Sequence, residues 1–205
     1  MAIIDGLNAT QLDVVKEIGN IGAGNACTAL SVLLGTTIDM SVPSVKFLDF
    51  DQTSEYLGGD KENILGIRVD VTDDLEGMMF HIVGKSFAER IINTFYAKSL
   101  DTLSVLDEMD SSVLNEMANI TSGAYANSLA TLTGLFVNIG APIQKCGTVG
   151  EILKIPFENN VTIGEKILVI DEVFEIGDEK THSNMILVLE KNSLKKLFDK
   201  LGVQE

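Results

Sequence analysis

The 205-residue chain contains an internal repeat, and this feature constrains its fold more than any other. When residue i is aligned with residue i + 99, identical residues fall at equivalent positions: Glu17 with Glu116, Asn20 with Asn119, Gly24 with Gly123, Leu30 with Leu129, Gly35 with Gly134 and Pro43 with Pro142. In each copy, Glu-x-x-Asn is followed by 22 residues and then by a proline. Because the chain has only three prolines, two of them at matching positions indicate a duplication.

The C-terminal parts of the two halves also align, at the larger offset of 106 residues. Residues 78–95 match residues 184–201, so the second half has about seven additional residues before its last strand. We expect these residues in the polar stretches 157–161 or 177–184, which are typical of loops. The sequence therefore predicts one domain made of two repeats, about 1–98 and 99–205.

Each half predicts the same series of elements. A long helix is followed by a strand region that contains the proline, at about 10–34 and 37–48 in the first half and 110–133 and 136–147 in the second. After a polar connection come two strands and a closing amphipathic helix, at 65–71, 78–84 and 86–96, then at 166–176, 184–190 and 193–202. Short connections favour antiparallel pairing. We expect an α+β fold: a single pseudo-two-fold-symmetric domain, with a mostly antiparallel sheet and two long helices that carry the motifs.

Charge and composition exclude several classes of function. The net charge of −15 repels phosphate backbones and anionic lipid surfaces, so we expect neither nucleic acid nor a membrane as a partner. Two cysteines do not make a disulfide framework, which favours a reducing, cytoplasmic compartment. The N-terminus lacks the pattern of a signal peptide, and no window of about 18 residues is apolar enough to span a membrane.

The repeated motif places polar side chains on one stripe of each long helix. At about 100° per residue, Asp13, Glu17 and Asn20 lie within roughly 60° of one another. In the second copy the stripe consists of Ser112, Glu116 and Asn119. Thr10 and Asp13 have the spacing of a capping box, which predicts that the first helix begins at Thr10. The opposite face of this helix is rich in small residues, which let another backbone approach closely.

A Glu and an Asn three residues apart do not form a complete active site. The Asn amide can orient a water molecule, and the Glu carboxylate can pair with a cation. No serine–histidine pair or metal-ligand cluster accompanies them, and His81 and His182 are expected in the core or at its rim. The pair therefore suits action on a partner that already holds most of the machinery. Phosphoryl transfer fits, because its catalysis consists mainly of positioning and charge stabilisation.

The two motifs resemble the paired signature of the CheC/CheX/FliY family of chemotaxis phosphatases, and in particular its CheC-type members. The matching residues are Asp13, Glu17, Asn20 and Pro43 in the first copy, and Ser112, Glu116, Asn119 and Pro142 in the second. The resemblance covers essentially the whole chain, including the duplication. Neither copy departs from the family pattern at these positions.

This resemblance implies that the chain hydrolyses the aspartyl phosphate of the response regulator CheY. Asn20 and Asn119 would orient the attacking water, and Glu17 and Glu116 would contact a lysine in the regulator. The chain would need no cofactor of its own, because the divalent metal belongs to the regulator. Family members of the CheC type also bind CheD, a receptor deamidase, which is a second expected partner.

Two alternatives remain open from the sequence. The chain could be a non-catalytic binding module of the chemotaxis or flagellar switch system, since related components share the fold without the Glu–Asn pair. It could also act mainly by sequestering CheD, with weak hydrolysis as the signal it reads. The glycine-rich stretch 19–24 is not a dinucleotide loop, because a capped helical pattern precedes it.

Overall fold

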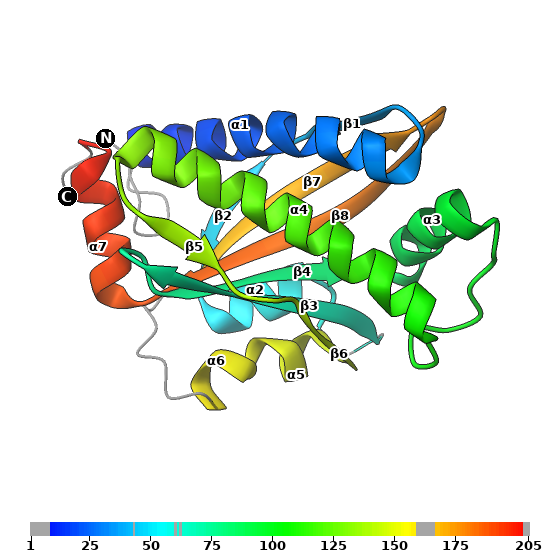
Figure 1. Cartoon of the computed structure of the whole chain (residues 1–205). Helices are drawn as coiled ribbons and strands as arrows, with labels where there is room; N and C mark the ends of the chain where they lie inside the picture. The colour runs from blue at the N-terminus through cyan, green and yellow to red at the C-terminus, as the bar shows by residue number, and fades with distance from the viewer. Residues whose placement is uncertain (1–8, 43, 60, 62, 159–166, 203–205) are drawn as a thin grey trace.

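The computed structural model in Figure 1 describes residues 9–42, 44–59, 61, 63–158 and 167–202. The first half of the chain forms α1 (Ala9–Leu34), β1 (Ile38–Ser41), β2 (Val45–Leu48), α2 (Phe50–Tyr56), β3 (Ile64–Asp73), β4 (Gly77–Val83) and α3 (Lys85–Tyr96). The second half forms α4 (Glu108–Thr133), β5 (Val137–Ile139), β6 (Ile143–Gly147), α5 (Val149–Leu153), α6 (Ile155–Glu158), β7 (Ile167–Ile176), β8 (Glu179–Leu189) and α7 (Lys191–Lys200). The predicted fold class is confirmed. The boundary between the repeats stays a prediction, and it falls in the connection between α3 and α4.

The strands of both halves form one antiparallel sheet, in the order β1-β7-β8-β4-β3-β5, with β2 also paired with β7 and β6 with β3. The halves are interleaved, because β1 and β2 extend the hairpin of the second half, whereas β5 and β6 extend that of the first. At the centre, β4 pairs with β8, and Phe80 lies directly opposite Ile186. These two residues are equivalent at the offset of 106, so a pseudo-two-fold axis passes between them.

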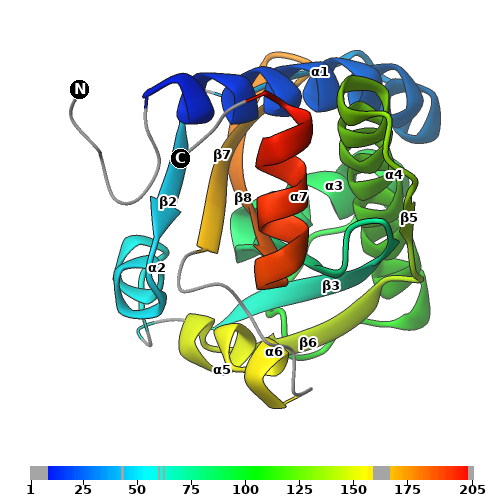
Figure 2. The ribbon, with the colours of Figure 1, turned by 90° about the vertical axis from the view of Figure 1, so that its left-hand side faces the viewer.

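Helices cover both faces of this sheet. In Figures 1 and 2, α1 and α4 lie over one face, α2, α5 and α6 lie over the other, and α7 and α3 close the two ends. The central strands are therefore buried on both sides, which explains their long apolar runs. Side chains that face α5 form one core cluster with Phe80 and Ile186. Those that face the long helices form two more clusters, one beside α7 and the other beside α3.

The two long helices cross at a point of very close approach. They run in opposite directions along the top of Figure 1. A Cβ atom added to Gly22 of α1 would lie 2.9 Å from a ring carbon of Tyr125 on α4, so only glycine fits there. The predicted role of the small residues in the first helix is thus confirmed. No described helix is long and apolar enough to cross a bilayer.

Each closing helix holds the hairpin turn of the other half. Lys196 of α7 donates to the main-chain oxygen of Asp74 at 2.8 Å, in the turn after β3. Arg90 of α3, which is equivalent to Lys196 at the offset of 106, donates to the main-chain oxygen of Ile176 at 2.6 Å, at the end of β7. Arg90 also pairs with Glu179 across the same turn. These crossed contacts link the two repeats at both ends of the sheet.

Three local predictions are wrong. Helix α1 already includes Ala9, so Thr10 lies within its first turn and is not the cap. The stretch 177–184 is a loop only at Gly177 and Asp178, because β8 begins at Glu179 and the hairpin of the second half is longer. Of the alternative stretch 157–161, residues 157 and 158 belong to α6, and residues 159–161 lie outside the described residues. The connection after β2 forms the short helix α2, whose capping box is made by Asp49 and Gln52.

Candidate functional site

All four side chains of the predicted Glu–Asn pairs are exposed on the outer face of the long helices. Glu17 and Asn20 lie on α1, and Glu116 and Asn119 lie on α4. In both helices the neighbouring residues on the inner face are buried, for example Ile18 and Met117. Within the described part of the chain, no hydrogen bond or ion pair engages these four side chains. They are free to contact another molecule.

The second motif lies in an open groove of about 540 Å³ between α4 and the segment that joins β5 to β6. The groove is lined by Glu108, Ser111, Ser112, Asn115, Glu116, Asn119, Ala141 and Pro142. It therefore brings together all four motif residues that the sequence analysis assigned to the second copy. Among the described residues that line it, the two charged ones, Glu108 and Glu116, are carboxylates, which suits a partner that presents a cation.

One wall of this groove is held by a fixed hydrogen-bond arrangement. The side-chain nitrogen of Gln144, on β6, donates to the main-chain oxygen of Ser111 and to the Oδ1 atom of Asn115, both at 2.9 Å. A main-chain oxygen can only accept, so the Gln144 atom that faces it must be the nitrogen. The Asn115 atom that faces the same nitrogen must then be the oxygen. This leaves the Asn115 amide nitrogen without an acceptor in the described part of the chain.

The first motif has a related but different surrounding. A Cβ atom added to Gly19 would lie 3.3 Å from the side chain of Val42, so Val42 lies directly against α1 beside Asn20. Ser44, two residues further along the chain, donates a hydrogen bond from its hydroxyl to the carboxylate of Asp171 on β7. Pro43 itself lies outside the described residues. Lys16 occupies the position equivalent to Asn115, and its side chain is exposed.

Because α1 and α4 run in opposite directions, the two motifs lie toward opposite ends of the helix pair (Figure 1). Each motif is in the N-terminal half of its helix, and the helices cross near Gly22 and Tyr125, beyond both motifs. The two candidate sites are therefore separate surfaces of one face of the molecule.

The N-terminus of α4 is fixed by charged groups just before the second motif. Asp107 caps the helix and forms a capping box with Asp110. Lys98 donates to the carboxylates of Asp107 at 2.7 Å and of Asp110 at 2.6 Å. Hydrogen bonds to these two carboxylates raise the pKa of Lys98, and the bond from Lys98 lowers the pKa of Asp107. This capping positions the helix turn that lines the groove.

Two buried polar pairs lie beneath the helix crossing and were not predicted. The Tyr125 hydroxyl donates to Glu172 on β7 at 3.0 Å, and the Nε2 atom of His81 lies 2.9 Å from the Ser122 hydroxyl. Burial raises the pKa of Glu172 to about 8 and lowers that of His81 to about 4, so both groups are neutral near pH 7. They lie in the core, as expected for His81, whereas His182 is exposed.

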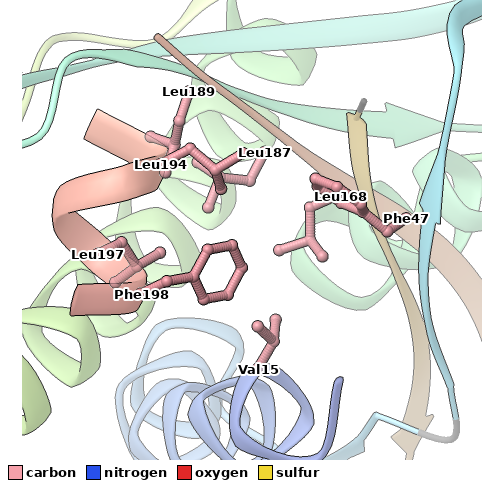
Figure 3. Close-up of a pocket in the computed structure, with 8 residues that line it drawn as sticks. All are labelled: Val15, Phe47, Leu168, Leu187, Leu189, Leu194, Leu197 and Phe198. Atoms are coloured by element: carbon pink, nitrogen blue, oxygen red, sulfur yellow. The ribbon is translucent and has the colours of Figure 1, made fainter. Parts of the chain in front are cut away.

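The apolar hollow in Figure 3 belongs to the core. Its volume is about 10 Å³, roughly the space that one water molecule needs. Its walls are aliphatic or aromatic and come from α1, β2, β7, β8 and α7 (Figure 3). It cannot hold a substrate. Among the described residues, no three side chains of His, Cys, Asp or Glu are grouped as a metal ion would require.

Four lining residues of the second groove were not predicted from the motif: Glu108, Ser111, Asn115 and Ala141. A signal for the helical members was present. Residues 108, 111, 112, 115, 116 and 119 follow the spacing of one helix face, so a longer stripe could have been read from the sequence. Gln144 could not be found in this way, because its contact with α4 depends on the position of β6.

Comparisons with known proteins agree with this geometry. The model of the CheC-like family matches residues 11–47 and 109–143, which include one motif each. The CheY-P phosphatase CheC of Bacillus subtilis (strain 168) is 32% identical over 206 residues, covering 98% of this chain and 99% of the relative. The flagellar motor switch phosphatase FliY of the same organism is 30% identical over 142 residues, 68% of this chain and 36% of that protein.

The fold has a solved counterpart as well. The crystal structure of Thermotoga maritima FliY superposes with a TM-score of 0.77 at 26% identity, covering 97% of this chain and all of that one (100%). The matches lie on both repeats and on both motifs, and the similarity to the Bacillus subtilis relative extends along nearly the full length of the two chains. The prediction from the repeated motif is confirmed: this chain belongs to the CheC-like family.

Proposed function

We propose that this chain is a phosphatase that hydrolyses the aspartyl phosphate of the response regulator CheY. The observation that carries the proposal is the groove on α4, where Glu116 and Asn119 are exposed, have no partner among the described residues, and face an opening bounded by Pro142. A relative that aligns over nearly its whole length is named a CheY-P phosphatase.

In this mechanism the helix face enters the active site of the regulator. The amide of Asn119, or of Asn20 at the first site, would hold a water molecule in line with the phosphorus, because an amide both donates and accepts. The carboxylate of Glu116 or Glu17 would pair with a lysine of the regulator. Both side chains stand on helices whose inner faces are buried, so the backbone positions that carry them are fixed before the partner arrives.

The chain needs no metal for this reaction, since the regulator would supply the divalent ion that neutralises the phosphoryl oxygens. The excess of carboxylates around the second groove favours a partner that presents a lysine. A cytoplasmic location follows from such a partner. We also propose CheD as a second partner, on the family resemblance alone.

The test is the lifetime of phosphorylated CheY from the same organism, with and without this chain. We expect the wild type to shorten it. Asn20→Ala and Asn119→Ala should each remove one site, and the double variant should lose at least about 100-fold in rate, as expected for removal of the group that positions the nucleophile. Circular dichroism of the double variant checks that the fold is intact.

An unchanged lifetime with the wild-type chain would exclude hydrolysis and favour the binding-module alternative. Binding of CheD to the double variant tests the remaining alternative, in which the chain acts mainly by sequestering CheD. If CheD binds equally well to the wild type and to the double variant, sequestration does not depend on the catalytic side chains.

A further inference from the structure

The two candidate sites differ at the residue before the glutamate. Asn115 lines the second groove, whereas Lys16 stands at the equivalent position of the first motif. The difference extends to the strand beside each helix. Gln144 holds Asn115, but Val45 occupies the position equivalent to Gln144 and cannot form the same bonds. The second site therefore has a fixed amide that the first site lacks.

We propose that Asn115 is a partner-contact residue of the second site, which donates a hydrogen bond from its amide nitrogen to phosphorylated CheY. This inference rests on the proposed function. Its support is the orientation that Gln144 and the Ser111 carbonyl impose, since Oδ1 of Asn115 is engaged and its Nδ2 atom has no acceptor in the described structure. Asn115 is also half-buried, so little side-chain freedom remains to be lost on binding.

The acceptor on the regulator would be a phosphoryl oxygen or a main-chain carbonyl near the phosphorylation site, because only an acceptor can satisfy this nitrogen. Lys16 cannot substitute for it in the same way. Its ammonium is a mobile point charge on an exposed side chain next to Glu17, and it would oppose an incoming lysine. We therefore expect the second site to bind the regulator more tightly than the first.

The experiment uses the full chain with Asn20→Ala, which leaves only the second site to measure. In this parent, Asn115→Asp keeps an oxygen for Gln144 to donate to but removes the amide donor, and Asn115→Leu removes both. Each variant should raise the Michaelis constant for phosphorylated CheY about fivefold, the usual worth of one uncharged hydrogen bond, with kcat changed by less than about twofold. Gln144→Leu should give a smaller increase, because the donor is retained but no longer fixed.

The matched control is Asn127→Asp, which makes the same chemical change at an exposed position of α4 outside the groove. Its Michaelis constant should equal that of the parent, whereas an increase like that of Asn115→Asp would overturn the inference by showing a general charge effect. If the parent is active and Asn115→Asp leaves its Michaelis constant unchanged, the inference is also overturned, while the proposed function stays intact. If the wild type is active but the Asn20→Ala parent is not, the second site is not catalytic and the inference is overturned. If the wild type itself leaves the phosphorylated regulator unaffected, the proposed function fails as well.

Discussion

Single buried residues connect the stability of this molecule to pH. Glu172 has a pKa of about 8 in the fold against an ordinary value of 4.5, because burial disfavours its charged form. His81 has a pKa of about 4 against 6.5, for the same reason. Between pH 4.5 and 6.5 the two effects oppose each other, since the folded chain holds a proton on Glu172 that the unfolded chain lacks, and the unfolded chain holds one on His81.

Above pH 6.5 only the Glu172 effect remains, so the free energy of unfolding should fall as the pH rises to about 8, by roughly 1 to 2 kcal/mol in all. Glu172→Gln keeps an acceptor for the Tyr125 hydroxyl and removes the titration. We expect this variant to gain stability relative to the wild type across that window, as measured by urea unfolding at several pH values. Parallel pH profiles of the two chains would contradict the assignment.

Among single residues, the position of the motif side chains could be predicted from the sequence, because helical spacing places Glu17 and Asn20 on one stripe. The burial of Glu172 could not be predicted. Its strand, ILVIDEVFEI, contains three acidic residues. Of these, only Glu172 is fully buried, and it meets the Tyr125 hydroxyl on a helix distant in sequence. Buried polar partners of this kind are set by tertiary contacts.

At the scale of elements, the crossing of α1 and α4 is the contact that positions both motifs relative to the sheet. The long helices and the main strands were predictable, since their apolar patterns extend over many residues. The short helices α2 and α5 were not, because each is a single capped turn or two, too short to show a helical apolar pattern. Their caps, made by Asp49 and Thr148, are visible only when the connection is read for capping signals.

Two glycines of α1 offer a matched test of the crossing. Gly22→Ala places a methyl group against the buried Tyr125 ring and should destabilise the fold by about 1 to 3 kcal/mol. Gly24→Ala meets no atom of the described residues within 4 Å and should stabilise the fold by about 0.5 to 1 kcal/mol, through helix propensity alone. Thermal or urea unfolding measures both. Equal effects of the two substitutions would show that the crossing is looser than described.

For the whole molecule, the interleaved sheet determines how the chain folds. Strand β3 takes β5 and β6 from the other half as its neighbours, and β4 takes β8. The duplication made the single pseudo-symmetric domain predictable. The exchange of edge strands was not predictable, because a repeat in the sequence does not say whether its two copies pack side by side or share strands.

We therefore expect that neither half exists as a folded monomer. Fragments 1–98 and 99–205, expressed separately, should be unfolded or dimeric by circular dichroism and sedimentation, because each leaves the inner edge of β4 or β8 unpaired. Mixed together, they should regain the spectrum of the full chain. A folded monomer of either fragment would show that its hairpin is stable without the other half.

The axis between Phe80 and Ile186 also has an evolutionary meaning. A half-length ancestor could have built the same sheet as a symmetric dimer, since the central β4–β8 pairing relates equivalent residues. In such a dimer any mutation would have altered both sites at once. Fusion of the two copies removed that restriction, so one site could keep its activity while the other changed. Lys16 and Asn115 are a difference that only the fused chain could have acquired.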